Sequence, residues 1–484
     1  MVIQYIMILL MDRLHNIFMS GGVNMGFTNV HDVLIMDDKE NIYSFYIHEN
    51  KIKMILYDKN TGKATKRVII GDCIDEYDSA ISEDGIVYLV CQKLDGSIML
   101  VSIDGYNQEE YFLAEKFDSR LRDINVKLIG NQIHIIYCLE SNEGNNRFRI
   151  YHHRLKNNEW DTNVVSDITI REILNPISII KLEDDMVIGY YDLVDNTEQV
   201  FINIYSIVNS KWSDKIQVTT DRSTKMYLDM LNCNANEINL CYSKFLEGNF
   251  IVTYEKYRMS NGEATKVVEH TLSNPANCMY PTFIYSDGTL WTIWIEYNGL
   301  LSCFSEDGGL SWSLPYSWEE SKRADFARYK FTTNNDAIKD AYDFNYGFAT
   351  YGESTTFIGF GDVEAAIEVP LKSQIKKKED EDEDIENDVD NEGIMLEKEV
   401  SRIQENIVKE KEVDESIELN EIRERVEVIE QALKAITEIL ETKLSEINFQ
   451  SQYEHENSKK ITELEKRVFD IESFLSKRRG PLRR

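Results

Sequence analysis

The chain has 484 residues, more than one domain of ordinary size, and 42% of them are hydrophobic, which is enough for a sizeable core. Its 85 acidic and 53 basic side chains give a formal net charge of −32, which repels phosphate backbones and excludes nucleic acid as a ligand of the main body. The seven cysteines form no CxxC pair and no cluster with histidine, so they predict no metal site, and we expect no cofactor and a reducing, cytoplasmic setting.

Residues 1–24 are an uncertain N-terminal extension. The apolar run from Ile3 to Met11 has no basic residue before it and is too short for a membrane-spanning helix, which needs roughly 20 residues. Three interpretations remain: a mis-called start with translation beginning at Met25, a secretion signal or anchor, and a structured extension. We expect no membrane span.

Residues 25–365 contain internal repeats that predict an all-β propeller. Strand-like runs rich in β-branched and aromatic residues recur about every 44 to 54 residues, the size of one four-stranded blade. They begin at Asn41, Gly85, Asn131, Asp185, Asn236 and Gly288. No long helical periodicity interrupts them, which excludes a doubly wound α/β fold. Six such units fit the sequence. The segments NYGFATYG and TTFIGFGD, between residues 345 and 362, are expected to form a hairpin if a seventh, partial blade is present, so six and seven blades both remain open.

One short motif in the last regular repeat carries a family resemblance. The residues Ser305, Asp307, Gly309 and Trp312 match the pattern S-x-D-x-G-x-[TS]-W. This pattern resembles the Asp-box of sialidases and many other propellers, and the resemblance extends over roughly residues 25 to 362. It implies a fold-maintaining turn on the outer hairpin of a blade, in which the carboxylate accepts backbone N–H bonds, glycine permits a positive φ and tryptophan packs beneath.

The resemblance to sialidases also implies an active site that this sequence does not supply. Such an enzyme would carry an arginine in an F/Y-R-I-P motif of the first blade, two more arginines, a Tyr–Glu pair and an Asp acid/base. The string from Phe148 to Tyr151 lacks the proline and lies in the third repeat. The arginine candidates for a carboxylate clamp are Arg149, Arg171, Arg222 and Arg258. No catalytic or ligand-binding residue can be assigned.

Three histidines are considered as metal ligands. His152 and His153 are adjacent on a predicted strand, so they point to opposite faces and cannot readily hold one ion. His134 lies within an apolar run and is interpreted as a buried, hydrogen-bonded side chain.

After the repeats the composition changes. Residues 366–394 are dense in charge and predict a disordered acidic linker. Residues 395–477 contain apolar steps of three and four without proline, which predicts an oligomerising coiled coil that favours trimers or tetramers. Its core positions are Leu419, Ile422, Val426, Ile429, Leu433, Ile436, Leu440, Ile461, Leu464, Val468, Ile471 and Leu475. A polar stretch from Lys443 to Asn457 interrupts the pattern, and it either fixes the register or is a hinge at which the two halves fold back into a hairpin. Residues 478–484 are a basic tail.

Two classes of function follow from this organisation. The first is a non-enzymatic binding or scaffold protein, in which the propeller recognises a glycan or a protein and the coiled coil multiplies the site. The second is a sialidase-like glycoside hydrolase with its active site in the channel mouth. Other glycosidase chemistry needs only two carboxyl groups roughly 5 to 10 Å apart, and the sequence nominates no such pair. The Ile, Asn and Lys richness is typical of an AT-rich bacterium, where a cell or spore surface is the alternative location.

Overall fold

The computed structural model describes residues 27–372, apart from short gaps at 115–118, 131, 142–145, 157–158, 172–173, 183–184, 233, 235, 247, 261 and 351–355. The chain divides into two units, Met1–Glu383 and Asp384–Arg484, and every described residue belongs to the first. The N-terminal extension, most of the acidic linker, the coiled coil and the basic tail lie outside the described residues. No helix within the described part is long and apolar enough to cross a membrane.

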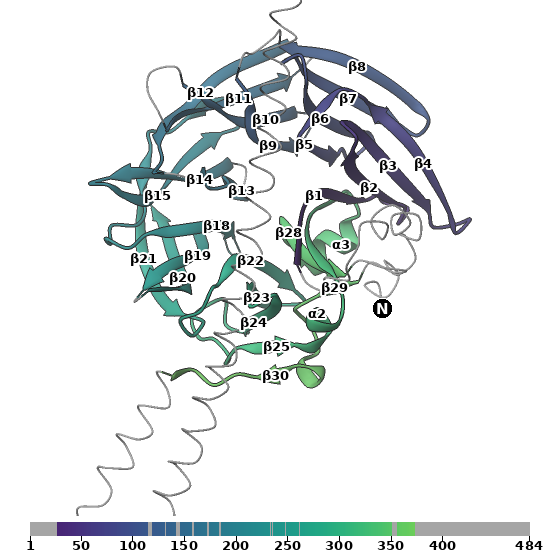
Figure 1. The fold of residues 1–484 in the computed structure, drawn as a ribbon. Coiled ribbons are helices and arrows are strands. Elements are labelled where there is room, and N and C mark those ends of the chain that lie inside the picture. Colours follow the sequence, from purple (N-terminus) through teal and green to yellow (C-terminus); the bar gives the residue numbers. More distant parts are fainter. Residues whose placement is uncertain are drawn as a thin grey trace, which may run out of the picture. The chain divides into compact units, whose positions relative to one another are not determined.

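The described residues form the predicted all-β propeller, with six sheets arranged around a common centre (Figure 1). In each blade the antiparallel strands run outward in chain order. Blade 1 contains β1 (Phe27–Met36), β2 (Ile42–His48), β3 (Lys51–Asp58) and β4 (Lys63–Ile70). Blade 2 contains β5 (Cys73–Ile81), β6 (Val87–Lys93), β7 (Ile98–Asp104) and β8 (Asn107–Ala114). Blade 3 contains β9 (Leu121–Ile129), β10 (Gln132–Glu140), β11 (Arg147–Lys156) and β12 (Glu159–Thr169).

The second half of the chain repeats this plan with small additions. Blade 4 contains β13 (Ser178–Leu182), β14 (Asp185–Val194), β15 (Thr197–Ser206) and an outer strand split into β16 (Lys211–Trp212) and β17 (Ile216–Gln217). Blade 5 contains β18 (Lys225–Leu231), β19 (Glu237–Leu246), β20 (Asn249–Ser260) and β21 (Glu263–Thr271). Blade 6 contains β22 (Met279–Ser286), β23 (Thr289–Glu296), β24 (Gly299–Ser305) and β25 (Tyr316–Trp318). It also gains β27 (Tyr342–Asp343) and β30 (Ile367–Glu368) at its edges. Each predicted repeat run becomes the second strand of its blade, where both faces pack against neighbouring sheets.

A partial seventh blade closes the ring. β26 (Phe326–Thr333), β28 (Tyr346–Thr350) and β29 (Phe357–Ile358) pair in that order, and β26 pairs in parallel with β1 at the other end of the chain. Phe326 and Phe348 pack against blade 6, whereas Tyr329 and Phe357 pack against blade 1. The predicted hairpin near residue 350 is therefore part of a three-stranded blade. Helices α2 (Glu319–Arg323) and α3 (Asp336–Ala341) flank β26 in the chain, and the 3₁₀ helix η2 (Val363–Ala365) precedes β30.

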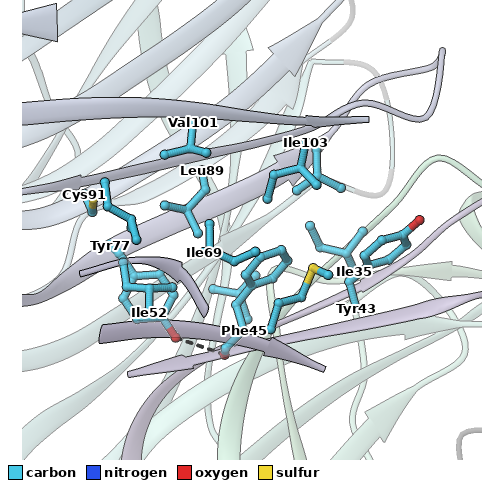
Figure 2. Close-up of a cluster of buried hydrophobic side chains, with 14 of the residues drawn as sticks. Ile35, Tyr43, Phe45, Ile52, Ile69, Tyr77, Leu89, Cys91, Val101 and Ile103 are labelled. Atoms are coloured by element: carbon cyan, nitrogen blue, oxygen red, sulfur yellow. Dashed lines mark hydrogen bonds between the residues drawn. The ribbon is translucent and has the colours of Figure 1, made fainter. Parts of the chain in front are cut away.

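The core lies between successive blades. Figure 2 shows the cluster between blades 1 and 2, where Phe45, Ile52 and Leu89 are completely buried. Tyr77 lies in the same cluster and donates its hydroxyl to the Phe45 carbonyl at 2.9 Å. That bond satisfies the one polar atom of a large buried ring, so the cluster holds adjacent blades together without an unpaired hydroxyl at this position.

Polar side chains join the innermost strands of neighbouring blades. Asp78 of β5 accepts the backbone N–H of Val126 in β9 at 2.6 Å. Asp229 of β18 accepts that of Phe283 in β22 at 2.9 Å. The same role falls to Ser178 of β13, whose hydroxyl accepts the N–H of Met230 at 3.1 Å. These bonds bring acidic and hydroxyl groups to the axis for a structural reason, so an acidic side chain there is not by itself a catalytic one.

Candidate functional site

Four side chains gather near the propeller axis, and we call them the axial cluster: Tyr227, Tyr280, Arg328 and Tyr346. The rings of Tyr227 and Tyr280 lie with their centroids 4.3 Å apart. The Arg328 guanidinium lies 3.8 Å from the centre of the Tyr346 ring and 5.6 Å from that of Tyr280. All four are partly exposed. The cluster combines aromatic faces with one permanent positive charge.

Backbone bulges set the direction of Tyr227 and Tyr280, whose ring planes are tilted 41° to each other. Tyr227 and Tyr280 have φ values of 60° and 51°, and each lies where the register of its innermost strand shifts against the second strand. Asp123 occupies the matching bulge of β9 with φ 53°. A positive φ is costly for a bulky residue, and bulges commonly redirect a side chain beside a functional site. The repeated bulge therefore marks this end of the innermost strands as a candidate site.

Arg328 is anchored through one nitrogen. Its Nε donates to the Thr282 hydroxyl at 3.1 Å. Burial raises the pKa of the nearby Asp229 carboxyl, and the positive charge of Arg328 offsets only part of this rise. Within the described part of the chain, the two terminal nitrogens of Arg328 make no hydrogen bond that would occupy their N–H groups. They can therefore donate to a carboxylate or sulfate of a ligand.

A second polar layer bridges the axis beside the cluster. Lys330 Nζ binds Asp78 Oδ2 at 2.5 Å and Asn125 Oδ1 at 2.9 Å, which links three blades. Lys127 donates to Asn345 Oδ1 at 2.8 Å, and burial lowers its pKa to about 8. Two hollows of about 200 and 160 Å³ share Lys127 in their linings. These lysines are already partnered, so they offer less to a ligand than Arg328 does.

Two carboxyl groups at the bulged end have raised pKa values. Burial and the nearby Asp123 charge raise the pKa of Glu76 to about 7. Burial raises the pKa of Asp123 to about 6. Glu76 also accepts the Asp123 backbone N–H at 3.1 Å, so the two residues are neighbours across blades 2 and 3. Each carboxyl can exchange a proton near neutral pH, which is the property that acid/base catalysis requires.

The arginine candidates named from sequence do not converge on the axis. Arg149 is on the third strand of blade 3 and forms a bidentate pair with Asp167 on the fourth, with its Nε 2.6 Å from Oδ1. Arg258 binds Glu237 on the neighbouring strand at 3.2 Å. Arg171 reaches the Thr224 hydroxyl at 3.3 Å, and Arg222 is exposed. The FRIY string thus lies on the third strand of blade 3 and not in the first blade.

The Asp-box residues form a tight turn between β24 and β25. The Ser311 hydroxyl donates to Asp307 Oδ2, and Asp307 Oδ1 accepts the backbone N–H groups of Ser311 and Leu310, both at 2.9 Å. The bond from the Ser311 hydroxyl, followed by the backbone bonds, lowers the pKa of Asp307 to about 2. The Ser305 hydroxyl accepts the N–H of Gly309, whose φ is 93°. Trp312 packs edge-on against Tyr254, with ring centroids 4.8 Å apart. We interpret this turn as fold-maintaining, which remains a prediction.

The three histidines belong to two separate contacts. His152 faces His134 and Trp212, with 2.9 Å between His134 Nδ1 and His152 Nε2. His153 lies on the other side of its strand and contacts Tyr137 and Thr162. The second nitrogen of His134 is buried without a partner, so this histidine is only half satisfied, contrary to expectation. Among the described residues no group of three or more His, Cys, Asp or Glu is placed to hold a metal ion.

Sequence reasoning missed the whole axial cluster. Arg328 lies in FARYKF, beyond the last regular repeat, and its neighbours come from three other segments of the chain. Tyr227 lies nine residues before the repeat run that begins at Asn236, and Tyr280 lies eight before the one at Gly288. Both are in innermost strands that the repeats did not delimit. One available signal was the lone arginine among aromatic residues in a strand-like run.

Comparisons with known proteins identify no family for the chain. No protein-family model matches the sequence. No curated protein matches it either. Among solved structures, it is similar to a polysaccharide lyase described as a PL25 ulvan lyase, with a TM-score of 0.42, 12% identity, and coverage of 71% of this chain and 98% of the other. It is also similar to the Aleuria aurantia lectin, with a TM-score of 0.36, 11% identity, and coverage of 60% and 95%.

A third similar structure is AofleA from Arthrobotrys oligospora, with a TM-score of 0.37, 11% identity, and coverage of 59% of this chain and 86% of the other. All of these TM-scores and identities are low.

Proposed function

We propose that this protein is a non-enzymatic binding protein whose propeller recognises a glycan at the axial cluster, and whose C-terminal coiled coil gathers several copies. The observation that carries the proposal is the placement of Arg328 between the rings of Tyr280 and Tyr346. Tyr280 itself lies at a strained bulge, with a φ of 51°. Strain of this kind persists where the surrounding structure enforces it, and it gathers at ligand sites. A protein ligand is the rival that the experiment below must exclude.

The chemistry of the cluster favours an acidic saccharide. Tyrosine rings offer flat faces against which the C–H faces of a sugar can pack. The terminal N–H groups of a guanidinium match the two oxygens of a carboxylate or sulfate. A single arginine with these rings therefore suits a uronic acid or a sulfated sugar. The formal net charge of −32 would repel such ligands elsewhere on the chain, which favours binding at one local cation.

Hydrolysis is the second candidate, favoured by one specific observation. The Glu76 and Asp123 carboxyls have pKa values raised to about 7 and about 6, which suits acid/base chemistry at neutral pH. A sialidase-like site would also need converging arginines, and the cluster contains one. The raised pKa values follow from burial among polar groups that join blades 2 and 3. We therefore rank hydrolysis below binding.

The experiment compares Arg328→Met with Arg222→Met in the full chain. Binding of a sulfated and a uronic-acid-containing polysaccharide is measured by titration calorimetry at fixed salt. We expect Arg328→Met to weaken binding at least tenfold, about 1.4 kcal/mol, because it removes the N–H fork. Arg222 is exposed and outside the cluster, so its variant should bind like the wild type.

The same mixtures distinguish the rival functions. New reducing ends that depend on Glu76 would establish hydrolysis in place of simple binding. Equal affinity of the two arginine variants would remove the axial cluster as the site. Absence of binding to any polysaccharide, together with capture of a protein ligand that is lost in Arg328→Met, would replace the glycan by a protein.

A further inference from the structure

A hollow of about 790 Å³ lies between blades 2 and 3, and we call it the interblade groove. Its walls come from β6, β7 and β8 on one side and from β11 and β12 on the other. None of its lining residues belongs to an innermost strand, so the groove is separate from the axial cluster. Its volume is within the range of about 300 to 1,000 Å³ that small-molecule sites occupy.

Aromatic rings line the groove from both blades. Tyr111 of β8 and Trp160 of β12 have 45% and 40% of their surfaces exposed, although both line a concavity. Tyr88 of β6 lies deeper, and Leu155, the cross-strand neighbour of Trp160, extends the apolar wall. A single exposed aromatic residue needs no explanation, but rings facing a hollow from two blades form a surface on which a flat ligand can stack.

The polar lining is acidic and mixed with hydroxyl and amide groups. Asp104 and Glu109 contribute carboxylates, Ser102 a hydroxyl and Asn107 an amide, and none of the described residues that line the groove is a lysine or arginine. Tyr111 donates its hydroxyl to Glu109, and this bond, with burial, raises the tyrosine's pKa. The bond also orients the Glu109 carboxylate on the groove wall. A lining with carboxylates and no cation disfavours an anionic ligand.

We infer that the interblade groove is a second saccharide site, specific for neutral sugars. Sugar hydroxyls both donate and accept hydrogen bonds, which matches a wall that mixes carboxylate, hydroxyl and amide groups. A cationic peptide would use the acceptors and leave the Asn107 and Ser102 donors idle. The apolar C–H faces of the same sugar pack on Tyr111 and Trp160. The site lies away from Arg328 and takes an uncharged saccharide in place of an acidic one, so it does not depend on the function proposed above.

The test uses the full chain and a panel of neutral trisaccharides built from glucose, galactose, mannose, fucose and N-acetylglucosamine. Binding is followed by saturation-transfer NMR and then by calorimetry. We expect at least one trisaccharide to bind, and Trp160→Ala and Glu109→Gln each to weaken it tenfold or more. Tyr106→Ala is the matched control, because Tyr106 is 85% exposed on the same β7–β8 hairpin and does not line the groove.

Additional variants separate the groove from the axial cluster and check that the groove variants are folded. Arg328→Met should bind the neutral trisaccharide like the wild type, whatever becomes of the acidic-glycan site. Thermal unfolding checks that Trp160→Ala is folded, and Asp104→Asn provides a second groove variant if it is not. No binding across the panel, unchanged affinity in the folded groove variants, or displacement of the sugar only by octalysine would each overturn the inference, the last in favour of a cationic peptide.

Discussion

At Gly309 the backbone passes directly over Tyr254. A Cβ placed on Gly309 would overlap the Tyr254 hydroxyl, and the φ of 93° is itself unfavourable for other residues. The adjacent Gly308 also has a positive φ, of 70°, but a Cβ there would meet nothing closer than 3.9 Å. The two glycines of the Asp-box turn therefore differ in the space around them while sharing the backbone requirement.

This difference gives a matched pair of variants. Gly308→Ala should lower the free energy of unfolding by about 1 kcal/mol, the cost of a left-handed residue. Gly309→Ala should lower it by more than about 3 kcal/mol, because a steric overlap in a packed region is added. Urea unfolding of both variants checks the prediction. Equal loss of stability in the two variants would show that the Tyr254 side chain can move away from a Cβ at position 309 without lowering the free energy of unfolding.

The buried histidines form a directed hydrogen-bonded chain. Trp212 Nε1 donates to His152 Nδ1 at 3.1 Å, so the His152 proton is on Nε2, which donates to His134 Nδ1. Protonating either ring would set a donor against a donor. Burial and, for His152, the neighbouring His134 lower the pKa values to about 4 for His134 and about 2 for His152.

Stability should depend on pH through His152. Its folded pKa is depressed, so the unfolded chain takes up a proton below about pH 6.5 while the folded chain does not until about 2. The wild type should therefore lose about 1.4 kcal/mol per pH unit relative to His152→Gln as the pH falls from 6.5 towards 4. The comparison must be with the variant, because Glu76 and Asp123 have raised pKa values and contribute with the opposite sign.

The measurement is chemical unfolding at four pH values between 7 and 4. His48→Gln controls for the loss of a histidine side chain as such, since His48 is solvent-exposed and lies outside this hydrogen-bonded chain. A stability curve for His152→Gln that runs parallel to that of the wild type would contradict a neutral, buried His152.

Among the elements, the seventh blade depends on aromatic packing. Phe348 on β28 is fully buried, and its ring contacts Phe326 and Phe27 at centroid distances of 6.3 and 6.4 Å. The blade has three strands, yet it connects β1 to blade 6 and so completes the ring. Packing in place of a full hydrogen-bonded sheet stabilises this segment.

Phe348→Ala should lower the free energy of unfolding by about 3 to 5 kcal/mol, as expected for a large buried ring. Phe112→Ala, at a 74% exposed site, should stay within about 0.5 kcal/mol of the wild type. Urea unfolding followed by near-ultraviolet and far-ultraviolet circular dichroism measures both. A normal stability for Phe348→Ala would mean that blade 7 is not needed to hold blades 1 and 6 together.

For the whole molecule, the open prediction is assembly. The core positions from Leu419 to Leu475 lie outside the described residues, and their heptad pattern predicts trimers or tetramers. Light scattering should give three or four times the monomer mass for the full chain and the monomer mass for a chain ending at residue 394. A chain ending at 477, which lacks only the basic tail, should assemble like the full chain. A monomeric full chain would indicate that the predicted helix folds back on itself.

The repeats could be recognised in the sequence because every blade of a propeller has the same order of strands and turns. Strand alternation and turn residues are local, and the second strand of each blade is buried on both faces, so it stands out as an apolar run. The partial blade was recognised only as a hairpin, since β26 pairs with β1 across nearly the whole propeller, and such a pairing leaves no local pattern. Arg328 was not predicted as a site residue for the same reason, since it lies on β26.

What the sequence determined by itself is the β-propeller and its repeat length, because these arise from short-range patterns. Only the tertiary structure decided which side chains reach the axis. A bulge, a ring closure and a pairing between residues 27 and 326 place Arg328 among tyrosines from distant strands. Proximity of this kind follows from how sheets close around a centre, and linear order does not encode it.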